Sequence, residues 1–163
     1  MDLKQFRELF HPLPGNHYLE VTTKVDATTL VLQELMNSVD GEFRLALYGS
    51  DELLLPDELQ QTNLQQLSKL NAPFRALPRD NDIVILKDIF TTHANPELLL
   101  RISYTTLANA AEVIIMEKKG LFDIEATKSL LEQFEFRAPN EIDIVAGYDV
   151  VMAKKMHMWG QGL

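Results

Sequence analysis

Short runs of apolar residues alternate along the chain with segments in which apolar positions recur at helical spacing. The first run, residues 18–22, is rich in β-branched and aromatic residues and predicts a strand. Asp26 or Thr28 then begins a predicted helix, which ends at Asp40-Gly41. The apolar positions of that helix follow the i, i+3, i+4, i+7 pattern and are Leu32, Leu35, Met36 and Val39.

Further apolar runs predict the remaining strands. Residues 43–48, 82–90 and 112–116 read as buried strands, and the run at 82–90 is nearly continuous, as a strand covered on both faces requires. A weaker strand is predicted at residues 73–77. Residues 141–146 and 148–153 are separated by Gly147 and predict a terminal β-hairpin.

Three more helices are predicted from their start signals. Asn95 and Pro96 have the residue types of an N-cap and a first helical position, and this helix should run to about residue 109. Asp123 caps a helix that should end near residue 134. Pro56 fits the first turn of another helix. The apolar positions of that last helix are Leu59, Leu64, Leu67 and Leu70.

The predicted order is β-α-β-α-β-β-α-β-α-β-β. Alternation of strands and helices favours a parallel sheet with helices on both faces, because right-handed crossovers place the helices there. The fold class is therefore α/β: a three-layer, Rossmann-like arrangement with a mostly parallel seven-stranded sheet and a C-terminal antiparallel hairpin. No Pro/Gly/Ser-rich linker divides the chain, so residues 1–163 are expected to form one domain, with residues 1–16 as an N-terminal extension.

Composition and charge restrict the partners and the chemistry. The 163 residues contain no cysteine, which excludes disulfides, thiolate metal sites and cysteine nucleophiles, and no His/Asp/Glu spacing indicates a metal. The net charge of −9 disfavours nucleic acid and anionic membrane surfaces as partners. With no apolar run near the ~20 residues of a membrane span and no apolar leader, we expect a cytoplasmic protein.

The order of elements and several local motifs resemble the class I S-adenosylmethionine-dependent methyltransferase family. The resemblance is strongest over residues 82–120, where a strand, a histidine-bearing turn, an Asn-Pro-Glu helix start and a further strand follow one another. It extends to LLEQFEF and YDVVMAKK near the C-terminus, and so covers residues 18–154. It implies the methyltransferase fold, S-adenosylmethionine as cofactor and methyl transfer as activity.

Two segments depart from the family pattern. In this family a glycine-rich turn follows the first strand, so that the backbone can approach the cofactor. Here the positions of its first two glycines hold Thr22 and Lys24, and none of the seven glycines lies between Asn16 and Asp40. Residues 108–111, Ala-Asn-Ala-Ala, replace a usual Pro-Gly-Gly turn. A Cβ at such positions penalises left-handed backbone by roughly 1–2 kcal/mol, so cofactor binding is expected to be weakened or altered.

The resemblance assigns four residues to the cofactor. Glu20 matches the first-strand acid that orders the cofactor loop, and Asp51 follows the second strand, where the family places the acid that bonds the ribose. Thr22 and Lys24 lie in the cofactor turn itself. The alternatives are structural: Glu20 as a strand-end acid facing solvent, and Asp51 as a turn cap.

Two residues are candidates for catalysis. Asp88 follows Lys87 at the end of the strand at 82–90, at the carboxyl edge where open α/β sheets bind ligands. It could orient the acceptor or act as a base, or it could bond only the following turn. His93 stands one residue away from the family's usual histidine in that turn, and a lone loop histidine is more often structural.

These observations leave two functions open. The first is an S-adenosylmethionine-dependent methyltransferase-like protein with altered cofactor binding and a small molecule or a protein as acceptor. The second is a catalytically inactive methyltransferase-fold scaffold, or a regulatory module that binds a protein partner or a second copy of itself. Loss of glycines at two separate cofactor positions favours the second.

Overall fold

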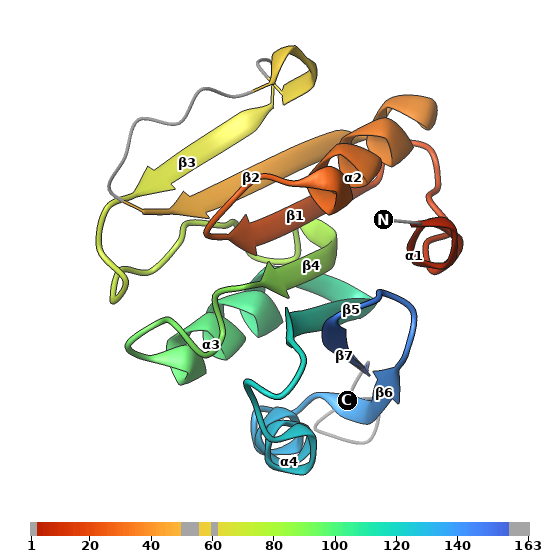
Figure 1. The fold of residues 1–163 in the computed structure, drawn as a ribbon. Coiled ribbons are helices and arrows are strands. Elements are labelled where there is room, and N and C mark those ends of the chain that lie inside the picture. Colours follow the sequence, from red (N-terminus) through yellow and green to blue (C-terminus); the bar gives the residue numbers. More distant parts are fainter. Residues whose placement is uncertain (1–2, 50–55, 60–61, 157–163) are drawn as a thin grey trace.

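The computed structural model describes residues 3–49, 56–59 and 62–156, and these form one seven-stranded sheet with helices on both faces (Figure 1). The strand order is β3-β2-β1-β4-β5-β7-β6. The first five strands in this order are parallel, and β7 runs antiparallel to both of its neighbours, β5 and β6. The strands are β1 His17–Thr22, β2 Glu42–Tyr48, β3 Asn63–Leu67, β4 Asn81–Lys87, β5 Leu107–Lys118, β6 Arg137–Ile142 and β7 Tyr148–Lys154. The helices are α1 Lys4–Glu8, α2 Ala27–Ser38, the 3₁₀ helix η1 Asp57–Leu59, α3 Pro96–Thr106 and α4 Ile124–Gln133.

Two apolar clusters form the layers on either side of the sheet. On one face, Leu32 and Met36 of α2 and Phe6 of α1 pack against Ile85 and Ile114. On the other face, α3 and α4 pack against the alternate strand positions. The residues of this second contact include Leu99, Leu100, Leu131, Val84, Leu86 and Ile115. The predicted three-layer α/β fold with a C-terminal antiparallel hairpin is confirmed, and α1 adds a helix that the sequence pattern did not predict.

Three predicted elements are wrong. The segment from Pro56 forms the short η1 and then β3, not one helix, because its leucines lack an i, i+3, i+4 repeat and residues 63–67 pair with β2. Residues 73–77, predicted as the third strand of the chain, have no regular secondary structure, and the third strand is β3. The first strand of the hairpin is β6, which overlaps the predicted 141–146 by two residues only, Glu141 and Ile142.

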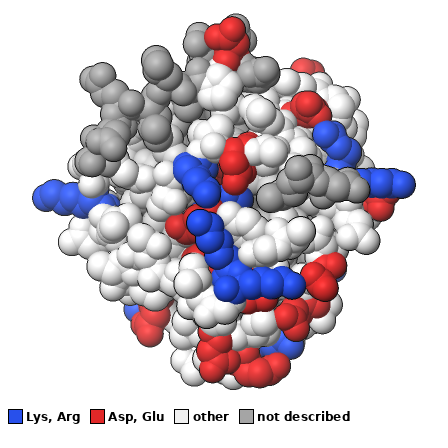
Figure 2. Space-filling view, viewed as in Figure 1, with Lys and Arg blue, Asp and Glu red and all other residues white. Residues whose placement is uncertain are grey.

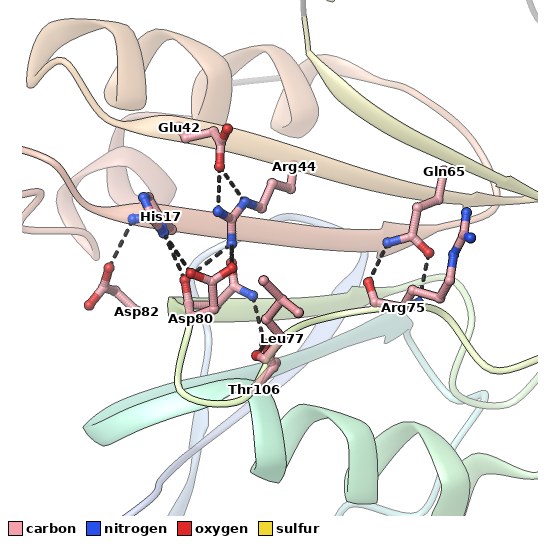
Figure 3. Close-up of polar contacts among 10 residues, drawn as sticks. His17, Glu42, Arg44, Gln65, Arg75, Leu77, Asp80, Asp82 and Thr106 are labelled. Carbon is pink, nitrogen blue, oxygen red and sulfur yellow. Dashed lines mark hydrogen bonds and ion pairs between the residues drawn. The ribbon is translucent and has the colours of Figure 1, made fainter.

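The connection from β3, an edge strand of the sheet, to β4 contains no helix. Gln65 of β3 binds it like a strand neighbour: its amide donates to the carbonyl of Arg75 at 2.5 Å and accepts from the Arg75 N–H at 2.7 Å (Figure 3). Arg44 of β2 pairs with Asp80 at 2.5 Å and with Glu42. These polar contacts tie the connection to β3, and its last residue, Asp80, to β2.

The surface agrees with the acidic composition. Figure 2 shows acidic side chains gathered over α4, whose sequence carries Glu125 and Glu132. In the described part of the chain, no helix has both the length and the apolar character needed to cross a membrane.

Candidate functional site

The carboxyl ends of β1, β4 and β5 meet at one edge of the sheet, where the sequence predicts the functional residues. The parallel register sets Thr22 beside Lys87, and Lys87 beside Met116. Asp88 follows directly, and the loop from β1 to α2 passes over the same edge. We call Lys87, Asp26, Asp88 and Tyr148, which bond to one another there, the Lys87 cluster.

Lys87 is the centre of the cluster and its side chain is fully buried. Its ammonium donates to Asp26 Oδ2 at 2.5 Å and to Asp88 Oδ2 at 2.8 Å, and it lies 5.2 Å from the centroid of the Tyr148 ring. Burial alone would lower the pKa of Lys87, but hydrogen bonds and charge from the two carboxylates raise it overall. The side chain is therefore held as a charged ammonium, not as a free base.

Asp26 joins the loop after β1 to the end of β4. Its Oδ1 accepts from the backbone N–H of Thr28 at 3.0 Å and caps α2, while the Thr29 hydroxyl completes a capping box. Burial opposes ionisation, but the bonds from Lys87 and Thr28 outweigh it and lower the pKa of Asp26. One carboxylate thus both starts a helix and pairs with a cation 61 residues further along the chain.

Asp88, a predicted catalytic residue, lies at this edge but is already engaged. Its Oδ2 accepts from Lys87 and, at 3.0 Å, from the Tyr148 hydroxyl. Its backbone has φ of 57°, a left-handed conformation that costs a non-glycine residue about 1–2 kcal/mol. The N–H bond to the Met116 carbonyl and the Thr23 hydroxyl bond to its own carbonyl hold it there.

Glu20 is fully buried beneath the loop, so the solvent-facing alternative is excluded. One carboxyl oxygen accepts from the Thr29 hydroxyl at 2.5 Å, and Oε2 has no hydrogen-bond partner among the described residues. Burial raises the pKa of Glu20 to about 7, against the opposing effects of Thr29 and Lys87. Near neutral pH the residue is divided between its acid and its carboxylate.

The turn after β1, where the resemblance places the cofactor, is occupied by its own side chains. The Thr22 hydroxyl receives the Lys24 N–H at 3.4 Å and donates to the Lys24 carbonyl at 3.1 Å, and the Lys24 side chain is exposed. Thr29 receives the Asp26 N–H at 3.4 Å. No residue from 22 to 26 has positive φ, so the strain expected at Thr22 and Lys24 is absent. In residues 108–111, the other segment that departs from the family pattern, Ala110 does have the left-handed backbone strain, with φ of 68°.

His93, the other predicted catalytic residue, has both ring nitrogens bonded to the backbone. Nε2 donates to the Ala72 carbonyl at 3.0 Å, and Nδ1 accepts from the Asn95 N–H at 2.9 Å. These bonds require the neutral ring, which packs edge-on against Tyr48 at 5.4 Å. The geometry corresponds to the structural alternative, since His93 ties the β3–β4 connection to the start of α3.

Three further residues of this edge were not identified from the sequence as part of a site. Asp26 was assigned only a capping role, although it stands two residues after Lys24. Tyr148 begins β7, and Glu117 of β5 is buried and accepts from the Thr91 N–H at 2.9 Å. Burial raises the pKa of Glu117. No sequence spacing connects these residues, because only the sheet brings them together. Asp51, predicted for the cofactor, lies outside the described residues.

The described residues do not fit S-adenosylmethionine as a glycine-rich turn would. Such a turn offers bare backbone and free N–H groups to its ligand. Here the N–H groups of Lys24, Asp26 and Thr28 bond to side chains of the chain itself, and each position carries a Cβ. Among the described residues, these bonds and the Asp26–Lys87 pair anchor the loop to the sheet, and Glu20 Oε2 is a buried acceptor without a partner.

Comparisons with known proteins agree with the topology. A crystal structure of the CurJ carbon methyltransferase superposes with a TM-score of 0.70 at 15% identity, covering 92% of this chain and 51% of that one. A SAM-dependent methyltransferase from Aquifex aeolicus gives 0.67 at 14% identity, covering 95% and 90%. Phosphoethanolamine N-methyltransferase 2 of Haemonchus contortus, in complex with S-adenosyl-L-methionine, gives 0.69 at 9% identity, covering 95% and 52%.

The chain thus spans about half the length of the first and third of these proteins. No protein-family model and no curated protein sequence matches it. At these identities the likeness concerns the fold alone, and both its sheet order and its closing hairpin agree with the sequence resemblance. The chain has the class I S-adenosylmethionine-dependent methyltransferase fold.

Proposed function

We propose that this chain is a methyltransferase-fold binding protein that does not use S-adenosylmethionine as a methyl donor. The observation that carries the proposal is the ion pair between Asp26 and Lys87. This pair joins the turn after β1 to the end of β4. The carboxylate of Asp26 and the ammonium of Lys87 therefore bond to each other and not to a ligand. In this turn the N–H groups of Lys24, Asp26 and Thr28 are bonded within the chain, and the Cβ atoms that replace glycine limit the close approach of a ligand.

Charge supports a protein or small-molecule partner over nucleic acid. The chain carries 24 acidic against 15 basic side chains, and phosphate neutralisation by Lys and Arg drives most nucleic-acid binding. A binding module of this kind would hold a partner protein or a second copy of itself, and the methyltransferase fold would serve as its scaffold.

A second candidate is a methyltransferase with an altered cofactor site. The unpartnered Oε2 of Glu20 favours it, because a buried carboxyl oxygen normally has a donor and a ligand could supply one. In that reading Glu20 and Asp51 hold the cofactor together with Thr22 and Lys24, and Asp88 orients the acceptor. Asp88 would then have to exchange a bond from Lys87 or Tyr148 for the substrate.

Calorimetric titration of the purified chain with S-adenosylmethionine and S-adenosylhomocysteine separates the two. The proposal expects no heat and no thermal shift at millimolar ligand. Micromolar binding that is lost in Asp51→Ala and Asp88→Ala, but kept in Glu132→Ala on the exposed side of α4, would overturn it in favour of the methyltransferase.

A gain-of-binding variant makes the test sharper. Asp26→Gly combined with Lys87→Met removes the ion pair from both sides and leaves no unpaired buried ammonium. If the pair is what excludes the cofactor, this double variant should bind S-adenosylhomocysteine better than the parent chain. If neither the parent nor the double variant binds, other features of the turn, such as Thr22 and Lys24, keep the cofactor out.

A further inference from the structure

The opposite edge of the sheet, where the strands begin, contains a pocket that the proposed function does not use. Its volume is about 340 Å³, within the lower range of small-molecule sites. The N-terminal segment before β1 forms one wall, and the starts of β1, β4 and β5 together with Met152 of β7 form the others. The lining residues used below are Phe10, Tyr18, Asp82, Ile83, Glu112 and Met152. We call this cavity the amino-edge pocket.

Tyr18 supplies an unused polar group to this pocket. The side chain is only 2% exposed, and no described residue hydrogen-bonds its hydroxyl, although the residue lines the cavity. Among the described residues, Glu20 Oε2 is the one fully buried side-chain oxygen without a partner, so the Tyr18 hydroxyl is not fully enclosed and is available to a ligand or to water. Burial raises the pKa of Tyr18 to about 12, with further contributions from the charges of Asp82 and Glu112. The hydroxyl therefore stays protonated, and both carboxylates lie close enough to act on it.

The two carboxylates give the pocket a negative potential. Asp82 is fixed because its Oδ2 accepts the His17 N–H at 2.8 Å (Figure 3), which leaves Oδ1 without a partner among the described residues. Glu112 makes no ion pair in the described part of the chain, although Lys154 stands opposite it across the β5–β7 ladder. The described lining contains no lysine or arginine, and its one imidazole is that of His11, so a cation that entered would meet carboxylates that no described ammonium or guanidinium pairs with.

The remaining walls select an organic cation over a hydrated metal ion. The rings of Phe10 and Tyr18 lie 5.6 Å apart, and Ile83 and Met152 add apolar surface. Aromatic faces attract ammonium and guanidinium groups, whose alkyl parts would contact the apolar wall. No group of three or more metal-ligating side chains occurs within the described residues.

We propose that the amino-edge pocket binds an alkylammonium or guanidinium group, with Glu112 and Asp82 as its counter-charges and the Tyr18 hydroxyl and ring as its neutral contacts. The group could belong to a free amine or to a Lys or Arg side chain of a partner protein. This pocket lies at the other end of the strands from the Lys87 cluster. The inference therefore stands whether or not the carboxyl edge binds S-adenosylmethionine.

Nuclear magnetic resonance titration of the full chain tests this site, with n-butylammonium chloride as the probe and n-butanol as its uncharged counterpart. We expect saturable amide shifts confined to the pocket residues, with millimolar affinity for butylammonium and at least tenfold weaker binding of butanol. A blocked Gly-Arg-Gly peptide, compared with its citrulline analogue, forms the second arm. Tighter binding of the Arg peptide than of butylammonium identifies a protein side chain as ligand, and the reverse identifies a free amine.

Glu112→Gln is the decisive variant because no described residue bonds to the Glu112 side chain, and the substitution leaves its backbone pairing in β5 unchanged. It should weaken butylammonium binding about tenfold, and Tyr18→Phe about threefold. Asp82→Asn is a second variant: it keeps an oxygen for the His17 N–H while removing the charge. Glu132→Gln on α4 removes the same charge far from the pocket and should change affinity by less than about twofold. Equal binding of butanol, no shift at pocket residues, or equal effects of Glu112→Gln and Glu132→Gln would each overturn the proposal.

Discussion

Replacing Lys87 by Met should destabilise the fold through the two carboxylates that it leaves behind. Met has a similar length and fills the same space, so packing changes little. Removing one partner of a buried pair typically costs about 3–5 kcal/mol, because the other charge stays buried without compensation. Here Asp88 is 10% exposed and Asp26 is 31% exposed, so water partly screens the second. We therefore expect a loss near the lower limit, about 3 kcal/mol.

The pH dependence of this loss has a definite sign. The folded-state pKa of Asp26 is lowered below its ordinary value of 3.8, so its stabilising contribution exists above that pH and disappears as the pH falls through the folded value. The pKa of Lys87 is raised above 10.5, so the ammonium stays charged through neutral and mildly alkaline conditions. Lys87 also lowers the pKa of Glu20, so Lys87→Met should raise that pKa above about 7. The difference between parent and Lys87→Met should therefore be larger at pH 9 than at pH 6, and it should shrink below about pH 4.

Urea unfolding followed by circular dichroism measures this difference directly. At pH 7 the midpoint should fall with an unchanged slope, and the melting temperature should drop by about 6–12 °C for a chain of this size. Lys24→Met is the matched control, because Lys24 is exposed and has no ion pair among the described residues; its effect should stay within about 0.5 kcal/mol. A loss below about 1 kcal/mol for Lys87→Met at pH 7, or an equal loss at pH 4, would refute the reasoning.

Three further substitutions test single features of the fold by the same unfolding measurement. Glu20→Gln should stabilise the protein by up to about 3 kcal/mol at pH 8 and have little effect at pH 4.5. The reason is that a folded-state pKa of about 7 makes ionisation of Glu20 costly only at the higher pH. Equal effects at both pH values would contradict this. Gly41→Ala should cost about 2–3 kcal/mol, because its Cβ would lie 2.5 Å from the Asn16 carbonyl oxygen, and a loss below about 1 kcal/mol would show that this contact relaxes. His93→Leu should cost about 2 kcal/mol through the two backbone groups it leaves unpaired, so an unchanged midpoint would return His93 to the catalytic candidates.

The sequence predicted those elements whose local pattern agrees with their place in the fold. The Asp26 cap and the spacing of Leu32 and Met36 define α2, and Asn95-Pro96 defines the start of α3. The strand at β4 was evident because its apolar run is continuous, as burial on both faces demands. With the other apolar runs, these elements predicted the parallel sheet. The second strand of the closing hairpin was predicted at its place in β7, whereas the first strand was placed too late in the chain.

Local pattern failed where the chain lies at an edge of the sheet. β3 has the sequence Asn-Leu-Gln-Gln-Leu and is only partly buried, so it shows no strong strand pattern, and its pairing with β2 decides its conformation. The connection that follows lacks a helix because Gln65 and His93 bind its backbone in an extended course. Neither bond follows from sequence spacing.

The sequence by itself determined the α/β class, the chain order of most of the elements from β1 onward and the departure from a glycine-rich turn. Only the tertiary structure decided what that departure means. Asp26 and Lys87 are 61 residues apart, and they meet because parallel strands bring their carboxyl ends to one edge. Burial then fixes their charges, because an ammonium removed from water is retained only when carboxylates pair with it. Periodicity is a local property of the chain, whereas pairing and burial depend on how the whole sheet assembles.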